Sequence, residues 1–216
     1  GADGATMLAK GGYERVTDYG KAIDDCLSEL KNGGHVKSAA DLHGVGFKTV
    51  LGRGVTGCVP ADERVIAALE GFREIAPAHN PPYALGIQRF QEKLPAVPRV
   101  ALFETAFYQW VPEAATRYAV PQAWHDAGVR RYGFHGTSHD YVTGKACEFL
   151  GIPREQFNTV VAHLGNGASL CAMDKRRSVA STMGFTAVEG LMMGTRTGSI
   201  DPGDAAMRAF ASRQTH

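Results

Sequence analysis

The sequence predicts an α/β protein, in which strands and helices follow one another along the chain, and two observations predict it. Runs of β-branched and small apolar residues, such as Arg99–Phe103 and Thr159–Leu164, have the length of buried strands. Other segments carry apolar residues at helical spacing, as Val65, Ile66 and Leu69 do. With 216 residues, of which 44% are hydrophobic and 21% charged, the chain can build one large domain or two modest ones.

Three helices are expected in the first half of the chain. The first has an apolar face around Ile23 and ends at the glycines 33–34, because glycine closes a last helical turn without strain. The second begins near Asp62, whose carboxylate can accept hydrogen bonds from the first free N–H groups of a helix. The third begins with Asn80 as its N-cap and Pro81 as its first helical residue.

Two strands and a domain boundary complete this half. The strands are expected at Val45–Leu51 and Arg99–Phe103. The segment Val111–Pro121 contains two prolines and is the expected hinge between lobes. We therefore expect two lobes, made of residues 1–111 and 112–216.

The second half is expected to hold a long helix followed by three strands. Ser138 is expected to cap the helix and Gly151 to close it. The apolar face of that helix is expected to consist of Tyr141, Val142, Ala146, Phe149 and Leu150. The strands are expected at Thr159–Leu164, Ala168–Met173 and Ser178–Thr182. A last helix is expected to start at Asp201-Pro202.

The charge and the cysteines limit the partners and the compartment. The formal net charge is +1, so we expect neither nucleic acid nor a membrane surface as a partner. No apolar run is long enough to cross a bilayer, and we expect no signal segment, because residues 1–12 do not combine basic and apolar residues in the pattern of one. The cysteines form no CxxC pair, which favours reduced thiols in a cytoplasmic protein over a zinc ribbon. They are Cys26, Cys58, Cys147 and Cys171.

The first stretch that carries chemistry is "VVAHLGNGASL", residues 160–170. A strand meets His163, and Gly165-Asn166-Gly167 then turns the chain into the next apolar run. Backbone N–H groups that no Cβ shields can approach a phosphate, and the amide and imidazole add donors. The same pattern is also typical of a plain hairpin turn, so both interpretations stay open at this point.

The second stretch is "RRYGFHGTSH", residues 130–139. His135 lies just before a helix N-terminus, where free N–H groups and positive potential favour an anion. Arg130 and Arg131 can equally be surface or structural charges. His135 and His139 also have the spacing of a metal pair, although no third ligand stands at a fixed distance.

The third stretch is "GLMMGTRTGSIDPG", residues 190–203. Its glycines keep the backbone around Arg196 adaptable, so that the guanidinium can reach charge that develops on a phosphoryl group in transfer. A purely structural arginine in a loop is the competing interpretation.

Together these stretches resemble the acetate kinase family, the acetokinases. Two further pieces match, "APAHNPP" (Ala76–Pro82) and "FETAF" (Phe103–Phe107), and "MGFTAVEGLMMGTRTGSIDPG" extends the third stretch. The matches run in the family's order from about Ala22 to Gly203. The resemblance implies an actin-like, ribonuclease H-like duplicated fold with mixed sheets flanked by helices, as in sugar kinases and heat-shock-chaperone ATPases.

The resemblance also implies a reaction. The family moves the γ-phosphoryl group of ATP to a short-chain carboxylate such as acetate, with Mg²⁺, and gives an acyl phosphate and ADP. By this resemblance Arg196 stabilises the in-line transition state and His135 hydrogen-bonds the moving phosphoryl group. Glu104 stands where the family usually has an aspartate near the magnesium, so it is expected to act on the metal indirectly.

Phosphate binding is the role that the resemblance gives to the turn around residue 166. The residues expected to hold phosphate are His163, Gly165, Asn166 and Gly167. Such a site works by positioning and charge stabilisation and needs no covalent nucleophile.

The substrate-binding residues depart most from the family. Lys48 takes the place of an arginine that grips carboxylate and phosphate, and a lysine offers a point charge instead of a bidentate fork. The family usually has Val, Leu, Phe and Pro as walls of the acyl pocket. The corresponding residues here are Val50, Ala78, Phe134 and Ala187, so two walls are smaller.

The matches cover a central part of such an enzyme. Neither the family's first phosphate hairpin, Asn-x-Gly-Ser-Ser-Ser-x-Lys, nor its later adenosine-binding segment appears, so we expect little turnover from this polypeptide alone. A full-length protein is expected to be a homodimer, as is usual in the family. Three alternatives stay open: a propionate or butyrate kinase of the same family, an inactive phosphate- or nucleotide-binding remnant, and a metallohydrolase built on His135, His139 and His163.

The smaller pocket walls predict a preference for an acid longer than acetate. Each CH2 group that is buried against Ala78 and Ala187 should add about 0.8 kcal/mol, or roughly a fourfold gain in kcat/KM. The measurement is kcat/KM for acetate, propionate and butyrate in a full-length enzyme that carries this chain. A ratio that favours acetate over both longer acids would reject the prediction.

Overall fold

The computed structural model describes residues 6–203, and the chain divides into two compact units, Gly1–Phe103 and Glu104–His216. Each unit holds one three-stranded sheet with helices, so the α/β class is confirmed. The units divide between Phe103 and Glu104, whereas the sequence suggested a boundary near residue 111. The expected hinge, residues 111–121, therefore lies inside the second unit and contains the short helix α4 (Glu113–Thr116).

The sheet of the first unit is mixed. Strands β1 (Val45–Thr49) and β3 (Arg99–Phe103) are parallel, and β2 (Cys58–Pro60) adds an antiparallel edge in the order β1-β3-β2. The first strand was expected to reach Leu51 but ends at Thr49. The parallel pair needs a long connection, and helices supply it.

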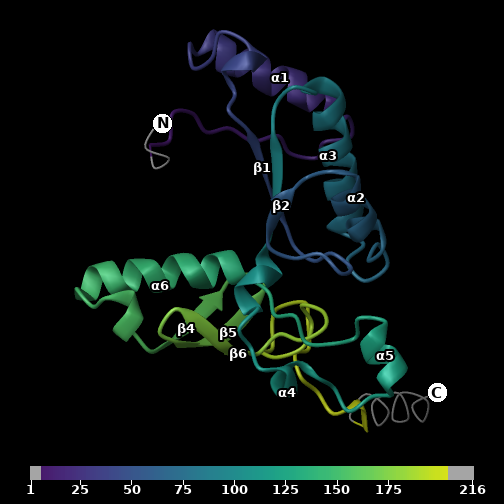
Figure 1. Ribbon diagram of the computed structural model, residues 1–216, viewed down its shortest axis with the longest axis vertical. Coiled ribbons are helices and arrows are strands. Elements are labelled where there is room, and N and C mark those ends of the chain that lie inside the picture. Colours follow the sequence, from purple (N-terminus) through teal and green to yellow (C-terminus); the bar gives the residue numbers. More distant parts are fainter. Residues whose placement is uncertain (1–5, 204–216) are drawn as a thin grey trace, which may run out of the picture. The chain divides into compact units, whose positions relative to one another are not determined.

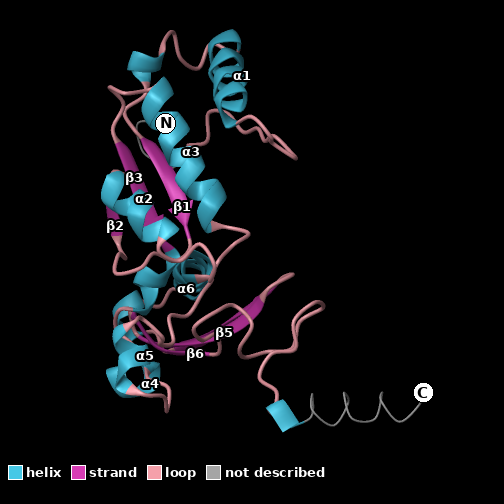
Figure 2. Cartoon of the chain, turned by 90° about the vertical axis from the view of Figure 1, so that its right-hand side faces the viewer, coloured by secondary structure: helices cyan, strands magenta, loops and turns pink. Residues whose placement is uncertain are grey.

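The helices of the first unit are α1 (Tyr19–Asn32), the 3-10 turn η1 (Ala39–Asp41), α2 (Glu63–Glu70) and α3 (Asn80–Lys93). Figures 1 and 2 show α2 and α3 lying side by side along the sheet. The core between them consists of Val55, Ala61, Val65, Ile66, Ala68, Leu69, Ala84, Ile87, Ala101 and Phe103. Burial of these apolar side chains is what fixes the helices to the sheet.

Two of the expected helix ends are confirmed. The carboxylate of Asp62 accepts hydrogen bonds from the backbone N–H groups of Arg64 and Val65, at 3.0 and 3.3 Å, as an N-cap does. Gly33 follows the last residue of α1, and its N–H donates to the carbonyl of Glu29. Both features are local, so the sequence alone was enough to predict them.

The expected role of Asn80 is wrong. His79 is the N-cap of α3, no side chain caps this helix, and Asn80 is its first residue. The Asn80 side chain is fully buried, and its amide nitrogen donates to the carbonyls of Leu51 and Leu69, at 2.9 and 3.0 Å. Asparagine binds here one buried loop carbonyl, that of Leu51, and one carbonyl in the last turn of α2, that of Leu69, which outweighs capping.

The second unit has an antiparallel sheet in the order β4-β5-β6. The strands are β4 (Thr159–Leu164), β5 (Ala168–Asp174) and β6 (Arg177–Ser181). The helices are the 3-10 helix η2 (Glu104–Tyr108), α4, α5 (Gln122–Asp126), α6 (Gly136–Leu150) and the 3-10 turn η3 (Arg154–Gln156). The long helix α6 runs beside the strands of this sheet (Figure 1).

Helix α6 exists where it was expected and ends before Gly151 as predicted, but its N-cap and its buried face were predicted wrongly. His135 is the N-cap, and the hydroxyl of Ser138 contacts the His163 ring instead of a backbone N–H group. The expected apolar face is largely exposed, as Phe149 at 86% and Tyr141 at 67% exposure show. The buried residues of this helix are Gly136, His139, Thr143 and Cys147. Packing of small and polar groups against the sheet therefore outweighs the apolar pattern.

The expected last helix lies mostly outside the described residues. Asp201 accepts a hydrogen bond from the N–H of Gly203 at 2.8 Å, which is the contact of an N-cap. Within residues 6–203, no helix combines the length and the apolar character that crossing a bilayer requires. The four cysteines are free thiols.

Replacing Asn80 by alanine should destabilise the chain by about 2 kcal/mol, because the carbonyl of Leu51 loses a buried donor and that of Leu69 keeps only backbone donors such as the N–H of Phe72. The measurement is the free energy of unfolding in urea. Asn32→Ala is the matched control, since Asn32 is exposed at the end of α1 and should change stability little. Equal stability of the two variants would contradict the role given to Asn80.

Candidate functional site

The N-terminus of α6 is held in an unusual conformation. His135 has φ = 60°, in the left-handed region that residues other than glycine rarely adopt. A Cβ on the next residue, Gly136, would collide with the carbonyl oxygen of Glu104 and lie 2.7 Å from Cβ of Phe107. Only glycine permits this close approach of α6 to η2. Strain of this kind persists where the surrounding structure fixes it, which is common at functional sites.

The segment before His135 is anchored as well. Gly133 has φ = 75°, and a Cβ there would meet the Tyr108 ring at 2.8 Å. The buried Tyr108 hydroxyl donates to the carbonyl of Phe134, whose side chain is 4% exposed. Residues 133–136 are therefore fixed from both sides of the backbone.

The hairpin between β4 and β5 has the turn that the sequence predicted. His163 pairs with Ser169 and Leu164 with Ala168, and the N–H of Gly165 donates to the carbonyl of Gly167 at 3.0 Å. Asn166 is exposed at the tip of the turn. The hairpin interpretation of this motif is thus confirmed, and phosphate binding stays a prediction.

Three imidazoles gather beside this hairpin. The rings of His135 and His163 stack with centroids 4.0 Å apart and planes at 21°. Nδ1 of His135 lies 2.8 Å from the Ser169 hydroxyl, and Nε2 of His139 lies 2.9 Å from the same oxygen. Nδ1 of His163 lies 2.8 Å from the hydroxyl of Ser138. Helix α6 and the hairpin are thus joined by side-chain hydrogen bonds as well as by packing.

Burial keeps His139 neutral. Its side chain is fully buried, and desolvation, followed by the nearby His163, lowers the pKa of His139 from 6.5 to about 4. Nδ1 of His139 has no hydrogen-bond partner within the part of the chain that the structure describes. His139 is consequently a structural imidazole and not a cation at neutral pH.

Arg196 reaches the same place from the third stretch. Its Nη1 donates to the carbonyl of Ala187 at 2.7 Å, and its own carbonyl accepts from the N–H of Met193 at 2.9 Å. The N–H of Ser199 donates to the carbonyl of Gly190 at 2.8 Å, which closes the loop. The carbonyl of Ala187 thereby orients the guanidinium, and the two backbone hydrogen bonds fix the loop that carries it.

Arg196 and His135 converge on one point beside the hairpin turn. A Cβ on Gly167 would lie 2.9 Å from Nε2 of His135 and 3.0 Å from Nη2 of Arg196. Two nitrogen atoms from distant parts of the sequence therefore face one small space that only a glycine leaves open. An imidazole and a guanidinium that face the same space can bind an anion there.

Glu104 lies next to the start of α6, because its backbone carbonyl packs against Gly136. It is 5% exposed at the start of η2, under the first residue of α6. Phe134 is the residue before His135 in the sequence. Ala187 contacts Arg196, because its carbonyl accepts a hydrogen bond from the guanidinium. The second unit thus brings together most of the residues that the sequence singled out.

The other three predicted residues belong to the first unit. Lys48 is exposed on β1, where it pairs with Leu102 of β3. Val50 is buried just after that strand, with 7% exposure, and Ala78 is exposed shortly before α3. Their roles in substrate binding stay predictions.

Sequence reasoning missed two groups that organise the site. One is Ser169, which lies inside the quoted hairpin motif but received no role. The other is Glu189, which accepts hydrogen bonds from Tyr118 and Arg131. The ion pair confirms the structural interpretation of Arg131, and the Arg131 guanidinium also lies 4.6 Å from the Tyr118 ring centre. No sequence signal linked these residues, because they lie 58 and 71 positions apart.

The metallohydrolase interpretation is not supported. Nitrogens of His135 and His139 both face the Ser169 hydroxyl, and a nitrogen of His163 faces that of Ser138. Residues 6–203 contain no group of three His, Cys, Asp or Glu side chains placed to hold a metal ion. The histidines form a hydrogen-bonded cluster instead.

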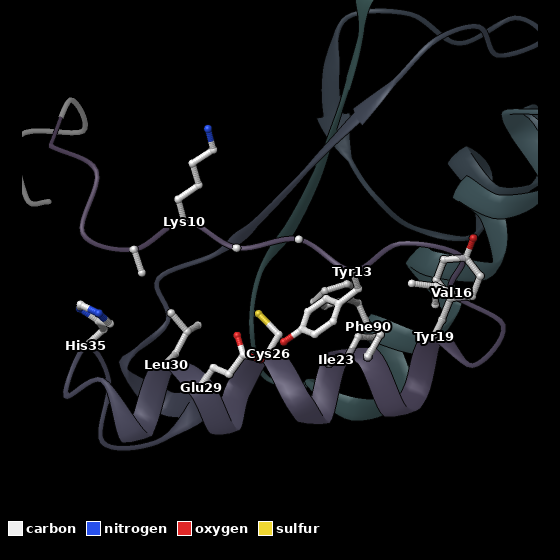
Figure 3. Close-up of a pocket in the computed structure, with 14 residues that line it drawn as sticks. Lys10, Tyr13, Val16, Tyr19, Ile23, Cys26, Glu29, Leu30, His35 and Phe90 are labelled. Atoms are coloured by element: carbon white, nitrogen blue, oxygen red, sulfur yellow. The ribbon is translucent and has the colours of Figure 1, made fainter.

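A cavity of about 520 Å³ lies elsewhere, in the first unit, between the segment 9–13 and α1. Tyr13, Ile23, Cys26 and Phe90 give it a mostly apolar wall (Figure 3). None of the predicted site residues lines it. The cavity is therefore separate from the candidate site.

Comparison with known proteins assigns the sequence to a family. The sequence profile of the Acetokinase family matches residues 9–215. The chain belongs to the acetokinase family. Acetate kinase from Kocuria rhizophila is 46% identical over 213 residues, which are 94% of this chain and 50% of that protein. The resemblance seen in the motifs is therefore confirmed.

Comparison with solved structures leads to the same family as comparison of the sequences. Porphyromonas gingivalis acetate kinase matches with a TM-score of 0.79 and 40% identity, over 90% of this chain and 50% of that one. A propionate kinase from Francisella tularensis matches with a TM-score of 0.77 and 34% identity, over 88% and 49%. The chain spans about half the length of the relatives that it matches. The actin-like fold class expected from the motifs is confirmed for this half.

The low pKa of His139 predicts a pH-dependent stability. Since the unfolded imidazole has a pKa near 6.5 and the folded one a pKa of about 4, the unfolded state binds more protons between these values. The stability is therefore full above pH 6.5 and falls by about 3 kcal/mol as the pH drops to about 4.

Two measurements check this prediction. An NMR titration should show the His139 ring neutral down to about pH 4. Urea unfolding at several pH values should show a slope that His139→Gln reduces and that His43→Gln, at an exposed position, leaves unchanged. Titration of the His139 ring at its ordinary value of 6.5 would refute the assignment.

Proposed function

We propose that this chain is the central part of a phosphotransferase that moves the γ-phosphoryl group of ATP to a short-chain carboxylate. One observation carries the proposal: Nε2 of His135 and Nη2 of Arg196 face one space beside Gly167, in a chain of the acetokinase family. The products are an acyl phosphate and ADP. Acetate is the first candidate substrate, because the similar proteins from Kocuria rhizophila and Porphyromonas gingivalis are acetate kinases.

The proposed mechanism depends on charge stabilisation. In phosphoryl transfer the negative charge spreads over the equatorial oxygens of the moving group, so preorganised donors lower the barrier. Arg196 offers a permanent cation whose orientation the carbonyl of Ala187 holds. His135 offers a ring nitrogen that the strained backbone at φ = 60° keeps in place. The carboxylate of the substrate is itself the nucleophile, so no covalent enzyme intermediate is needed.

Glu104 suits the Mg²⁺ that accompanies ATP in this family. Mg²⁺ binds proteins through one or two carboxylates and takes its remaining ligands from phosphates and water, so a single buried carboxylate fits that need. When bound, the metal would neutralise charge on the β- and γ-phosphates. We expect the carboxylate of Glu104 to contact the Mg²⁺ either through a bound water molecule or through one of its own oxygens.

Three of the residues predicted to bind the carboxylate substrate are Lys48, Ala78 and Ala187. Lys48 is exposed on β1 and can attract a carboxylate as a point charge. By the family's pattern Ala78 and Ala187 replace larger wall residues, which favours propionate as a second candidate substrate. The similarity to the F. tularensis protein, a propionate kinase, adds support to that candidate.

The setting of the full-length protein is also part of the proposal. We expect a cytoplasmic homodimer, as is usual in the family. Four free thiols are compatible with a reducing compartment.

A chimera tests the proposed function. This chain replaces the matching half of the K. rhizophila acetate kinase, and acyl phosphate is trapped as hydroxamate with acetate, propionate and butyrate. ATP binding is measured beside it by calorimetry. Product formation supports the proposal, whereas ATP binding without product would identify a remnant that has lost the chemistry.

Gly167→Ala in the chimera should reduce kcat/KM by about 10²-fold, because a Cβ there would displace His135 and Arg196 from the moving phosphoryl group. Gly144→Ala in α6 is the matched control, since a Cβ there meets only Nη1 of Arg154, at 4.0 Å. Equal losses in both variants would show that the space beside Gly167 does not limit activity.

A further inference from the structure

Ser169 lies between two histidines that the proposed mechanism treats differently. It is fully buried on β5, and its hydroxyl oxygen contacts Nδ1 of His135 at 2.8 Å and Nε2 of His139 at 2.9 Å. Its hydroxyl has one proton, which it can donate to only one of the two rings. The tautomer of one imidazole ring therefore determines the tautomer of the other.

The buried end of this chain of contacts is His139. Its Nδ1 is buried and has no partner among the described residues, and its Nε2 faces Ser169. An orphaned buried N–H group is rarer in proteins than an orphaned acceptor. The neutral ring therefore keeps its proton on Nε2 and donates it to the Ser169 oxygen. That ring stays neutral at physiological pH because burial lowers the pKa of His139 to about 4.

The position of the proton on His139 determines, through the Ser169 hydroxyl, the position of the proton on His135. Since the Ser169 oxygen accepts from His139, its own proton is free to be donated to Nδ1 of His135. A neutral His135 then carries its proton on Nε2, the nitrogen that faces the space beside Gly167. In the opposite arrangement Nε2 would present a lone pair to that space, which would repel an anionic oxygen.

We infer that Ser169 is a positioning residue which, together with His139, holds His135 in the Nε2–H form and so aims a hydrogen-bond donor at the phosphoryl site. The inference rests on the proposed function only for the identity of the anion. The stacking of His163 on the His135 ring at 4.0 Å holds the ring plane in the matching orientation.

The tautomer can be measured on this chain without any activity. Long-range 1H–15N NMR spectra distinguish a protonated from a bare ring nitrogen. In the unmodified chain at neutral pH, His135 should show a protonated Nε2 and a bare Nδ1, and His139 a protonated Nε2. A His135 proton on Nδ1 would overturn the inference directly, even if every variant failed to fold.

Variants then test whether Ser169 is the cause. Ser169→Ala should raise the Nδ1–H population of His135 severalfold, and Ser169→Thr, which keeps a hydroxyl, should restore the original form. Ser178→Ala is the matched control, because Ser178 is a fully buried serine on β6 whose hydroxyl donates to the carbonyl of Phe107 at 2.5 Å. An unchanged tautomer in Ser169→Ala, or an equal change in Ser178→Ala, would refute the role of Ser169.

The chimera links the tautomer to catalysis. Ser169→Ala should lower kcat about tenfold with little change in the KM for ATP, and Ser169→Thr should recover most of it. A tautomer shift with unchanged kcat would show that the donor at Nε2 does not act on the reaction. An inactive parent chimera would count against the proposed function, while the NMR result would still decide the tautomer.

Discussion

The approach of helix α6 to the 3-10 helix η2 is the constraint on which the candidate site depends. The first residue of α6 lies so close to the carbonyl of Glu104 that a side chain would collide with it. The preceding residue, His135, lies in the left-handed region, with its ring stacked against His163. Tyr108 holds the backbone just before this point through the carbonyl of Phe134. The position of one imidazole is thus a product of backbone contact, and the guanidinium of Arg196 meets it from an independently closed loop.

Features that depend on neighbouring residues could be predicted from the sequence, and features that depend on distant ones could not. Asp62 caps its helix because its carboxylate competes only with nearby N–H groups. Asn80 has the same local signature, but its amide serves two carbonyls from other segments of the fold. Ser138 likewise serves His163 instead of its own helix. A hydroxyl or an amide binds whichever partner the tertiary structure leaves unsatisfied, and a local pattern does not contain that information.

The candidate site shows the same division. The residues of the three stretches were found because glycines, histidines and an arginine stand in long, specific motifs, and the second unit brings His135, Gly167 and Arg196 together. Ser169 stood inside a quoted motif and was still missed, since its partners come from another element. The apolar face predicted for α6 was wrong because the packed face there is formed by small and polar residues, of which His139 is the largest. The long motifs identified the family, and tertiary packing determined which neighbouring residues contact the motif residues.

The triad of Tyr118, Arg131 and Glu189 has a consequence for protein engineering. Glu189 belongs to the segment that carries Arg196, whereas its two partners stand 71 and 58 positions earlier in the chain. A Cβ on Gly184 would also intrude on this triad. A transplant of residues 183–203 into another scaffold would therefore leave a carboxylate without its phenol and guanidinium. The smallest transferable module therefore includes Tyr118 and Arg131 together with the loop that carries Arg196.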